Sequence, residues 1–103
     1  MKKYTIYRAP KKVDRDLGKH ELVGVEHGED IYAATDAILR AVRADLSENP
    51  EYEGCDVAAY APELMDESFR TKRYQYYVIG SVAPVRASEN ILVDYGIIEQ
   101  EEA

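Results

Sequence analysis

The chain has 103 residues, of which 46% are hydrophobic and 32% are charged, and its formal net charge at pH 7 is −7. This length and balance predict one globular domain over residues 1–103 and exclude an extensively disordered chain. The one cysteine, Cys55, excludes an intrachain disulfide and a cysteine-based zinc cluster. No apolar run is long enough for a signal peptide or a membrane span, so a cytoplasmic location is expected by exclusion.

The first half of the chain predicts two strands followed by a helix. Residues 3–8 and 20–27 are rich in β-branched and aromatic side chains, and these two strands could pair as a hairpin with a long loop. Apolar residues recur every three or four positions over 31–47, which is typical of an amphipathic helix. Pro50 ends this helix, since a residue that precedes proline avoids the helical conformation.

The second half predicts three strands and a short helical turn. Residues 55–60 favour a strand, and 63–72 favour a short helical turn over a loop. Residues 73–82 and 91–98 show the alternation of strands and should form an antiparallel hairpin. The acidic end, 99–103, is expected to be frayed.

The predicted order of elements is therefore β-β-α-β-(short α)-β-β. One amphipathic helix and several strands are most simply combined in an α+β fold. We expect a mostly antiparallel sheet of four to five strands, with the main helix packed across one face.

Motifs that carry chemistry are missing from the sequence. It has no phosphate-binding glycine loop, no zinc-protease motif and no nucleophile elbow. His20 and His27 are seven residues apart, so they would point to opposite sides of a regular strand, which disfavours a joint metal site. Cys55 lies in a predicted strand, where a core residue is expected more often than a nucleophile. The sequence thus predicts no catalytic residue, no cofactor-binding residue and no metal site, and the protein is not expected to be an enzyme.

Tyrosine is the feature of the sequence that points to a function. There are nine tyrosines, one phenylalanine and no tryptophan, and tyrosine is enriched at the centres of protein interfaces. We therefore hypothesise a small non-catalytic binding module that acts through a tyrosine-rich sheet face. Its partner would be another protein or a second copy of the chain, giving a homodimer. The candidate interaction surface consists of Tyr74, Tyr76, Tyr77, Tyr95, Arg70 and Arg73.

Two alternative hypotheses use the charged residues. Arg70, Lys72 and Arg73 adjoin tyrosines 74, 76 and 77, and such a surface could bind single-stranded nucleic acid by stacking and phosphate neutralisation. The acidic net charge argues against nucleic acid as a partner. Acidic residues are concentrated between positions 21 and 69, so the protein could instead be a decoy that occupies a basic, nucleic-acid-binding groove of a partner. Ordinary solubility explains the same charge.

Overall fold

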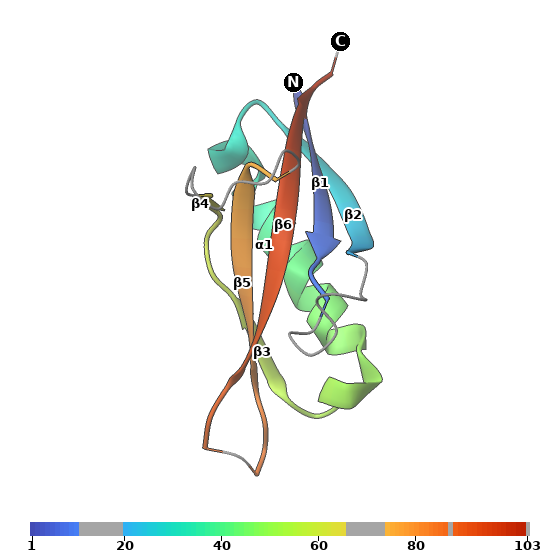
Figure 1. Cartoon of the computed structure of the whole chain (residues 1–103), viewed down its shortest axis with the longest axis vertical. Coiled ribbons are helices and arrows are strands. Elements are labelled where there is room, and N and C mark those ends of the chain that lie inside the picture. The colour runs from blue at the N-terminus through green and yellow to red at the C-terminus, as the bar shows by residue number, and fades with distance from the viewer. Residues whose placement is uncertain (11–19, 66–73, 87, 103) are drawn as a thin grey trace.

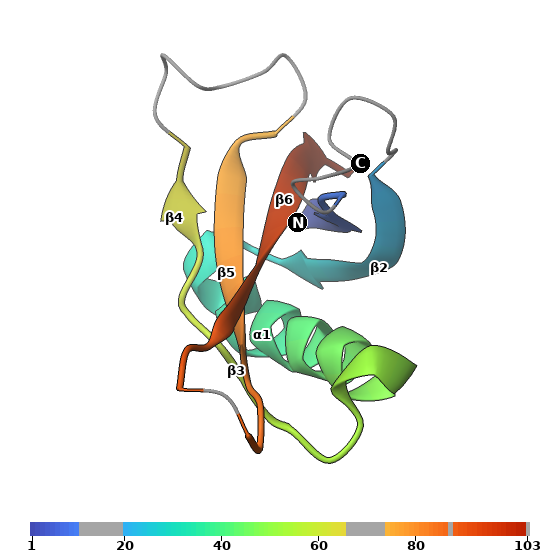
Figure 2. The same ribbon diagram turned by 60° about the horizontal axis from the view of Figure 1, so that its bottom comes forward.

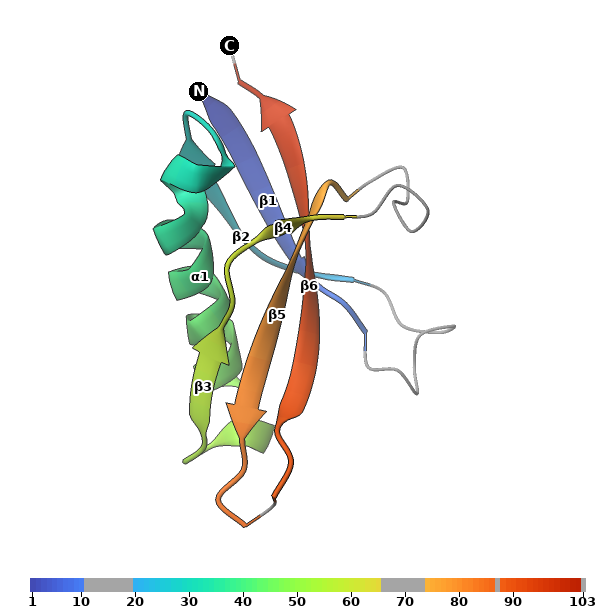
Figure 3. The same cartoon turned by 90° about the vertical axis from the view of Figure 1, so that its left-hand side faces the viewer.

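The protein has two layers, in which one long helix lies across one face of a curled antiparallel sheet (Figures 1 and 3). The computed structural model describes residues 1–10, 20–65, 74–86 and 88–102. The α+β fold with a helix packed on the sheet, expected from the sequence, is confirmed.

All pairs of neighbouring strands in the sheet are antiparallel, and the order is β2-β1-β6-β5-β3. The short strand β4 pairs with β5 on the side away from β6 (Figure 2). The first and last strands of the chain are therefore neighbours in the middle of the sheet, with both termini at one end (Figure 1). The strands are β1 (Lys2–Arg8), β2 (Glu21–Gly28), β3 (Asp56–Ala59), β4 (Glu63–Leu64), β5 (Tyr76–Ala83) and β6 (Ile91–Glu101).

The helix α1 spans Ile31–Glu48, so the helix expected over 31–47 is confirmed. The Asp30 side chain caps it by accepting a hydrogen bond from the Ala33 backbone N–H at 2.8 Å. Asn49 ends the helix, and a short 3-10 turn, η2 (Pro50–Tyr52), follows. The buried stripe of α1 consists of Ile31, Ala34, Ile38, Val42 and Leu46.

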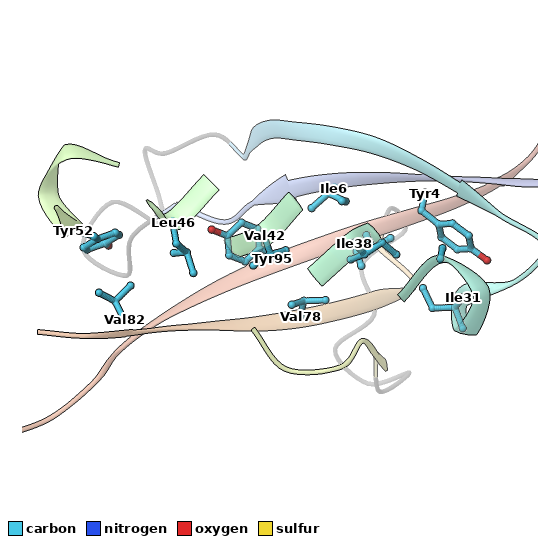
Figure 4. Close-up of a cluster of buried hydrophobic side chains, with 12 residues drawn as sticks. Tyr4, Ile6, Ile31, Ile38, Val42, Leu46, Tyr52, Val78, Val82 and Tyr95 are labelled. Carbon is cyan, nitrogen blue, oxygen red and sulfur yellow. The ribbon is translucent and has the colours of Figure 1, made fainter. Parts of the chain in front are cut away.

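The hydrophobic core lies between this stripe and the inner face of the sheet (Figure 4). Strand β1 contributes Tyr4 and Ile6, while β6 contributes Tyr95 and Ile97. Gly80 on β5 allows the helix to approach closely, since a Cβ there would lie 2.8 Å from a methyl group of Leu46. The other core residues drawn from the sheet and η2 are Val78, Val82 and Tyr52.

Within the described residues the sheet contains six strands, where four to five were expected, and two expectations about individual segments are wrong. Glu63 and Leu64 form a strand rather than a helical turn, because β5 offers them an unpaired edge beyond the end of β3. The rest of the expected turn, residues 66–72, lies outside the described residues. The expected frayed tail is instead ordered through Glu102, because β6 continues along β1 to the Lys2–Glu101 pair. The Glu102 N–H then donates to the Met1 carbonyl at 3.1 Å.

Candidate functional site

The two faces of the sheet differ in what covers them. Alternate residues of each strand point into the core beneath α1, and the residues between them point to the opposite side. No described helix covers that opposite side, which we call the open face (Figure 3). The open face consists of Leu22, Val25 and His27 on β2, Lys3, Thr5 and Tyr7 on β1, Asp94, Gly96, Ile98 and Gln100 on β6, Tyr77 and Ile79 on β5, and Tyr74 just before β5. The same side of the sheet continues past Asp94, where the exposed Leu92 on β6 pairs with Ser81 on β5.

Strand register arranges these side chains in four rows that cross the sheet. The polar row holds His27, Lys3 and Gln100, and the aliphatic row holds Val25, Thr5 and Ile98. The aromatic row is formed by Leu22, Tyr7, Gly96 and Tyr77, together with Tyr74, and the last row by Asp94 and Ile79. Successive rows are two residues apart along β1, β5 and β6, or about 7 Å, whereas on β2 a bulge places Leu22 three residues from Val25.

Tyr74 is built into the aromatic row by the absence of a side chain at Gly96. A Cβ on Gly96 would lie 2.6 Å from Cδ1 of Tyr74, so the tyrosine ring occupies the space that this glycine leaves. The rings of Tyr7 and Tyr74 pack edge to face, with centroids 5.9 Å apart and an interplanar angle of 72°. His20 contacts the Tyr74 ring at a centroid distance of 5.0 Å. Tyr74 is consequently 7% exposed and rigidly held.

Tyr77 is held from the other side of the aromatic row. Its hydroxyl donates a short hydrogen bond to the Glu63 carboxylate on β4. This hydrogen bond to a carboxylate raises the pKa of Tyr77 above its ordinary value, because it favours the protonated phenol. The ring is half-buried, and its contact with β4 fixes its direction.

The structure divides the tyrosines that the sequence grouped together. Tyr74 and Tyr77 lie on the open face, whereas Tyr76 and Tyr95 point toward the helix. Tyr95 is 1% exposed and donates to Asp45 Oδ2 at 2.7 Å, so it is a core residue. Arg70 and Arg73, together with Lys72, lie outside the described residues.

Regular alternation in the strand expected over 73–82 would place Tyr74 and Tyr76 on the same face, but the structure places them on opposite faces. β5 begins at Tyr76, after a bend at Gln75 whose N–H donates to the Ile97 carbonyl at 2.9 Å. The bend lets Tyr74 lie on the open face, while Tyr76 lies on the side of the sheet that faces α1. There the Tyr76 hydroxyl donates to Glu99 Oε2 at 3.3 Å.

Five residues of the open face were not among the site residues expected from the sequence: Tyr7, Thr5, Val25, Ile98 and Ile79. The alternation of each strand separates them from the core residues, and that signal was available. Alternation does not say which of two apolar faces the helix covers. Of this set Val25 is the most open, at 41% exposed.

Polar clusters on the helix side are internally satisfied. Arg8 donates from one nitrogen to both Asp45 oxygens at 2.8 Å and also pairs with Glu21. Glu99 accepts from Tyr4 at 2.9 Å, from Tyr76 and from the Lys2 amine at 3.4 Å. Throughout the described residues, every buried side-chain nitrogen or oxygen has a hydrogen-bond partner. These clusters tie the helix and the termini to the sheet and leave no polar group aimed at a ligand.

The described parts of the chain hold no group of three or more histidine, cysteine, aspartate and glutamate side chains arranged to bind a metal ion. Cys55 is partly buried against the core. Within the same residues, no helix has both the length and the apolar character needed to cross a membrane. Comparisons with family models, curated proteins and solved structures found no match to this chain.

Proposed function

We infer that the protein is a non-catalytic interaction module that binds a protein partner through the open face. The observation that supports this most directly is the adjacency of the aliphatic and aromatic rows on a face that no described helix covers. A contiguous apolar surface of this kind on a small protein marks an interaction site more often than an accident of folding.

The arrangement of the open face matches the usual anatomy of an interface. Its middle carries tyrosine and aliphatic side chains, and charged side chains stand at its two ends, with Lys3 at one and Asp94 at the other. An apolar centre with a polar rim is what specific protein interfaces have in common. The rim residues would set the orientation of the partner, while the central rows would supply most of the affinity.

Rigidity supports the same function. The Tyr74 ring is packed between Gly96, Tyr7 and His20, and the Tyr77 hydroxyl is bonded to Glu63. Aromatic side chains already fixed in the free protein lose little conformational entropy on binding. The open face is therefore preorganised as a docking surface.

The other hypotheses receive less support from the described residues. Stacking on bases needs an accessible ring, but Tyr74 is almost fully buried. A decoy for a basic groove needs a continuous row of acids, and the outer side of α1 mixes Asp36 with Arg40 and Arg43.

A photo-cross-linking experiment tests the proposal. A photoreactive phenylalanine analogue replaces Val25 on the open face or, as the matched control, Tyr32, which is 85% exposed on the helix. In cells that express the protein, we expect a protein adduct from position 25 that disappears when Ile98→Lys is added, and none from position 32. An absence of adducts at position 25, or equal adducts at both positions, would contradict the proposed function.

A further inference from the structure

Lys3 and Asp94 mark opposite ends of the open face. Lys3 is in register with Gln100 on β6, and Asp94 lies six residues away along that strand, a separation of about 20 Å. Within the described part of the chain neither side chain forms an ion pair. The nearby His27 is paired with Glu102 at 3.0 Å, so Lys3 is the charge left available at its end.

The apolar rows lie symmetrically between these two charges. Counting along β6, the midpoint between Gln100 and Asp94 is Ile97. The aliphatic row at Ile98 and the aromatic row at Gly96 stand one residue to either side of it. From Lys3 to Asp94, the face carries a cation, an aliphatic row, an aromatic row and an anion, and the exposed Leu92 lies beyond Asp94 on the same side of the sheet.

This sequence of rows is complementary to itself under one kind of two-fold rotation. A dimer with two-fold symmetry brings the same patch of both copies together. An axis that crosses the strands at Ile97 reverses the strand direction, so Lys3 of each copy meets Asp94 of the other. The same rotation lays the aliphatic row of each copy on the aromatic row of the other.

The competing axis, parallel to the strands, is unfavourable. It places every row against the same row of the other copy, which leaves Lys3 without an opposite charge and brings two Asp94 carboxylates together. Like charges at an interface oppose association, whereas opposite charges favour the register that joins them.

We propose that the partner bound by the open face is a second copy of this chain, in a face-to-face dimer whose two-fold axis crosses the strands at Ile97. This inference rests on the proposed function and names the partner. Lys3 and Asp94 form two equivalent intermolecular ion pairs at the rim, and the two sheets pack about 10 Å apart through the apolar rows.

The size of the open face sets the strength of this dimer. Four strands at about 4.8 Å spacing and four rows at about 7 Å spacing give a projected area of about 500 Å² per copy. Specific interfaces bury about 800 Å² of accessible surface per partner, measured over the side-chain relief rather than in projection. The dimer therefore belongs to the smaller specific interfaces and dissociates on dilution.

The exposed edge of β2 is a poorer surface for self-association than the open face. A β-bulge interrupts the pairing of β1 and β2 between Ile6 and Tyr7. In a regular strand Glu21 and His27 would point to the same face, because they are an even number of residues apart. The bulge instead places Glu21 on the core side and His27 on the open face. A bulged edge does not offer a regular ladder to a second strand.

Charge exchange between two variants tests the proposal. Lys3→Glu and Asp94→Lys should each weaken homodimer association by bringing like charges together, raising the Kd of the dimer about tenfold or more. An equimolar mixture of the two variants restores both ion pairs in a heterodimer and should dimerise like the wild type. Carrying both changes in one chain should also restore the homodimer. Sedimentation over a dilution series and native mass spectrometry of an isotope-labelled mixture measure these states.

Matched controls keep the charge change but move it to the outer side of α1. Arg43→Glu and Asp36→Lys should leave Kd unchanged, and thermal melts should show that all variants fold. A wild-type chain that stays monomeric at every concentration overturns the dimer. If the wild type dimerises but the mixture of the two charge variants dimerises no more tightly than either variant alone, the axis that crosses the strands is wrong. A monomer that still yields an adduct at Val25 with a different protein would refute this inference while leaving the proposed function intact.

Discussion

Tyr95 on β6 donates a 2.7 Å hydrogen bond to Asp45 on α1, from a ring that is itself buried in the core. The same carboxylate receives two bonds from Arg8 on β1, the residue paired with Tyr95 in the sheet. One helix side chain therefore holds two neighbouring strands, close to the C-terminal half of α1. Arg8 and Asp45 are largely shielded from water. Removing either side chain would therefore destabilise the folded state, because the other charge would lose its partner.

Asp45→Ala should lower the free energy of unfolding by about 2 kcal/mol, because the Arg8 guanidinium and the buried Tyr95 hydroxyl would lose their hydrogen-bond acceptor. Urea denaturation followed by circular dichroism measures the change. Asp36→Ala, an exposed position on the same helix, should change it by less than about 0.5 kcal/mol. If the two substitutions prove equally mild, Asp45 does not anchor the helix.

Gly96→Ala should damage the open face and cost about 1–3 kcal/mol of stability, because the new methyl group would overlap the Tyr74 ring. Displacing this ring should also abolish cross-linking through Val25. Gly24→Ala is the control, since a Cβ there has nothing within 4 Å. Calorimetry compares the two variants, and an alanine at 96 that melts like the wild type would mean that Tyr74 is not fixed by this glycine.

Much of the fold could be predicted from local patterns. The helix over 31–47 and the strands near 3–8, 20–27 and 91–98 each carry a periodicity set by neighbouring residues. The strand order could not be predicted, because pairing of β1 with β6 joins residues more than 85 positions apart in sequence. The ordered tail escaped prediction for the same reason, since its stability comes from β1 and not from its own acidic sequence.

The candidate site was less accessible to sequence reasoning than the fold. Alternation separates Tyr76 from Tyr77 but does not say which of them the helix covers. Tyr74 changes face at the bend of Gln75, and Tyr95 enters the core because Asp45 satisfies its hydroxyl. Both outcomes depend on partners distant in sequence, which a count of tyrosines does not reveal.

Truncation after Ile98 should lower the free energy of unfolding by about 3 kcal/mol. In a domain of this size each kcal/mol shifts Tm by about 4–8 °C, so Tm should fall by more than about 10 °C. The cut removes the end of the β1–β6 ladder and the Glu99 carboxylate that Tyr4 and Tyr76 share. Removing residues 102–103 alone should have a much smaller effect, because it spares both. Differential scanning calorimetry separates the two truncations, and equal melting temperatures would show that Glu99 does not secure the tail.

Alkaline pH should unfold the protein through its buried tyrosines. Burial first, and hydrogen bonding to Glu99 or Asp45 next, raise the pKa of Tyr4 and of Tyr95 far above the ordinary value of 10.0. A raised pKa in the folded state means that the neutral phenol is favoured there. Its stabilising contribution is complete below pH 10 and is lost as the pH climbs above the unfolded-state pKa toward the folded one.

The free energy of unfolding should consequently fall steadily above about pH 10, as measured by urea denaturation at a series of pH values. Tyr95→Phe should flatten this decline, since the phenol that ionises on unfolding is gone. Tyr32→Phe is the control and should not alter the decline, because Tyr32 is exposed on the helix and not part of the core. A decline of the same steepness in the Tyr95→Phe variant and the wild type would mean that the buried Tyr95 phenol does not limit stability at alkaline pH.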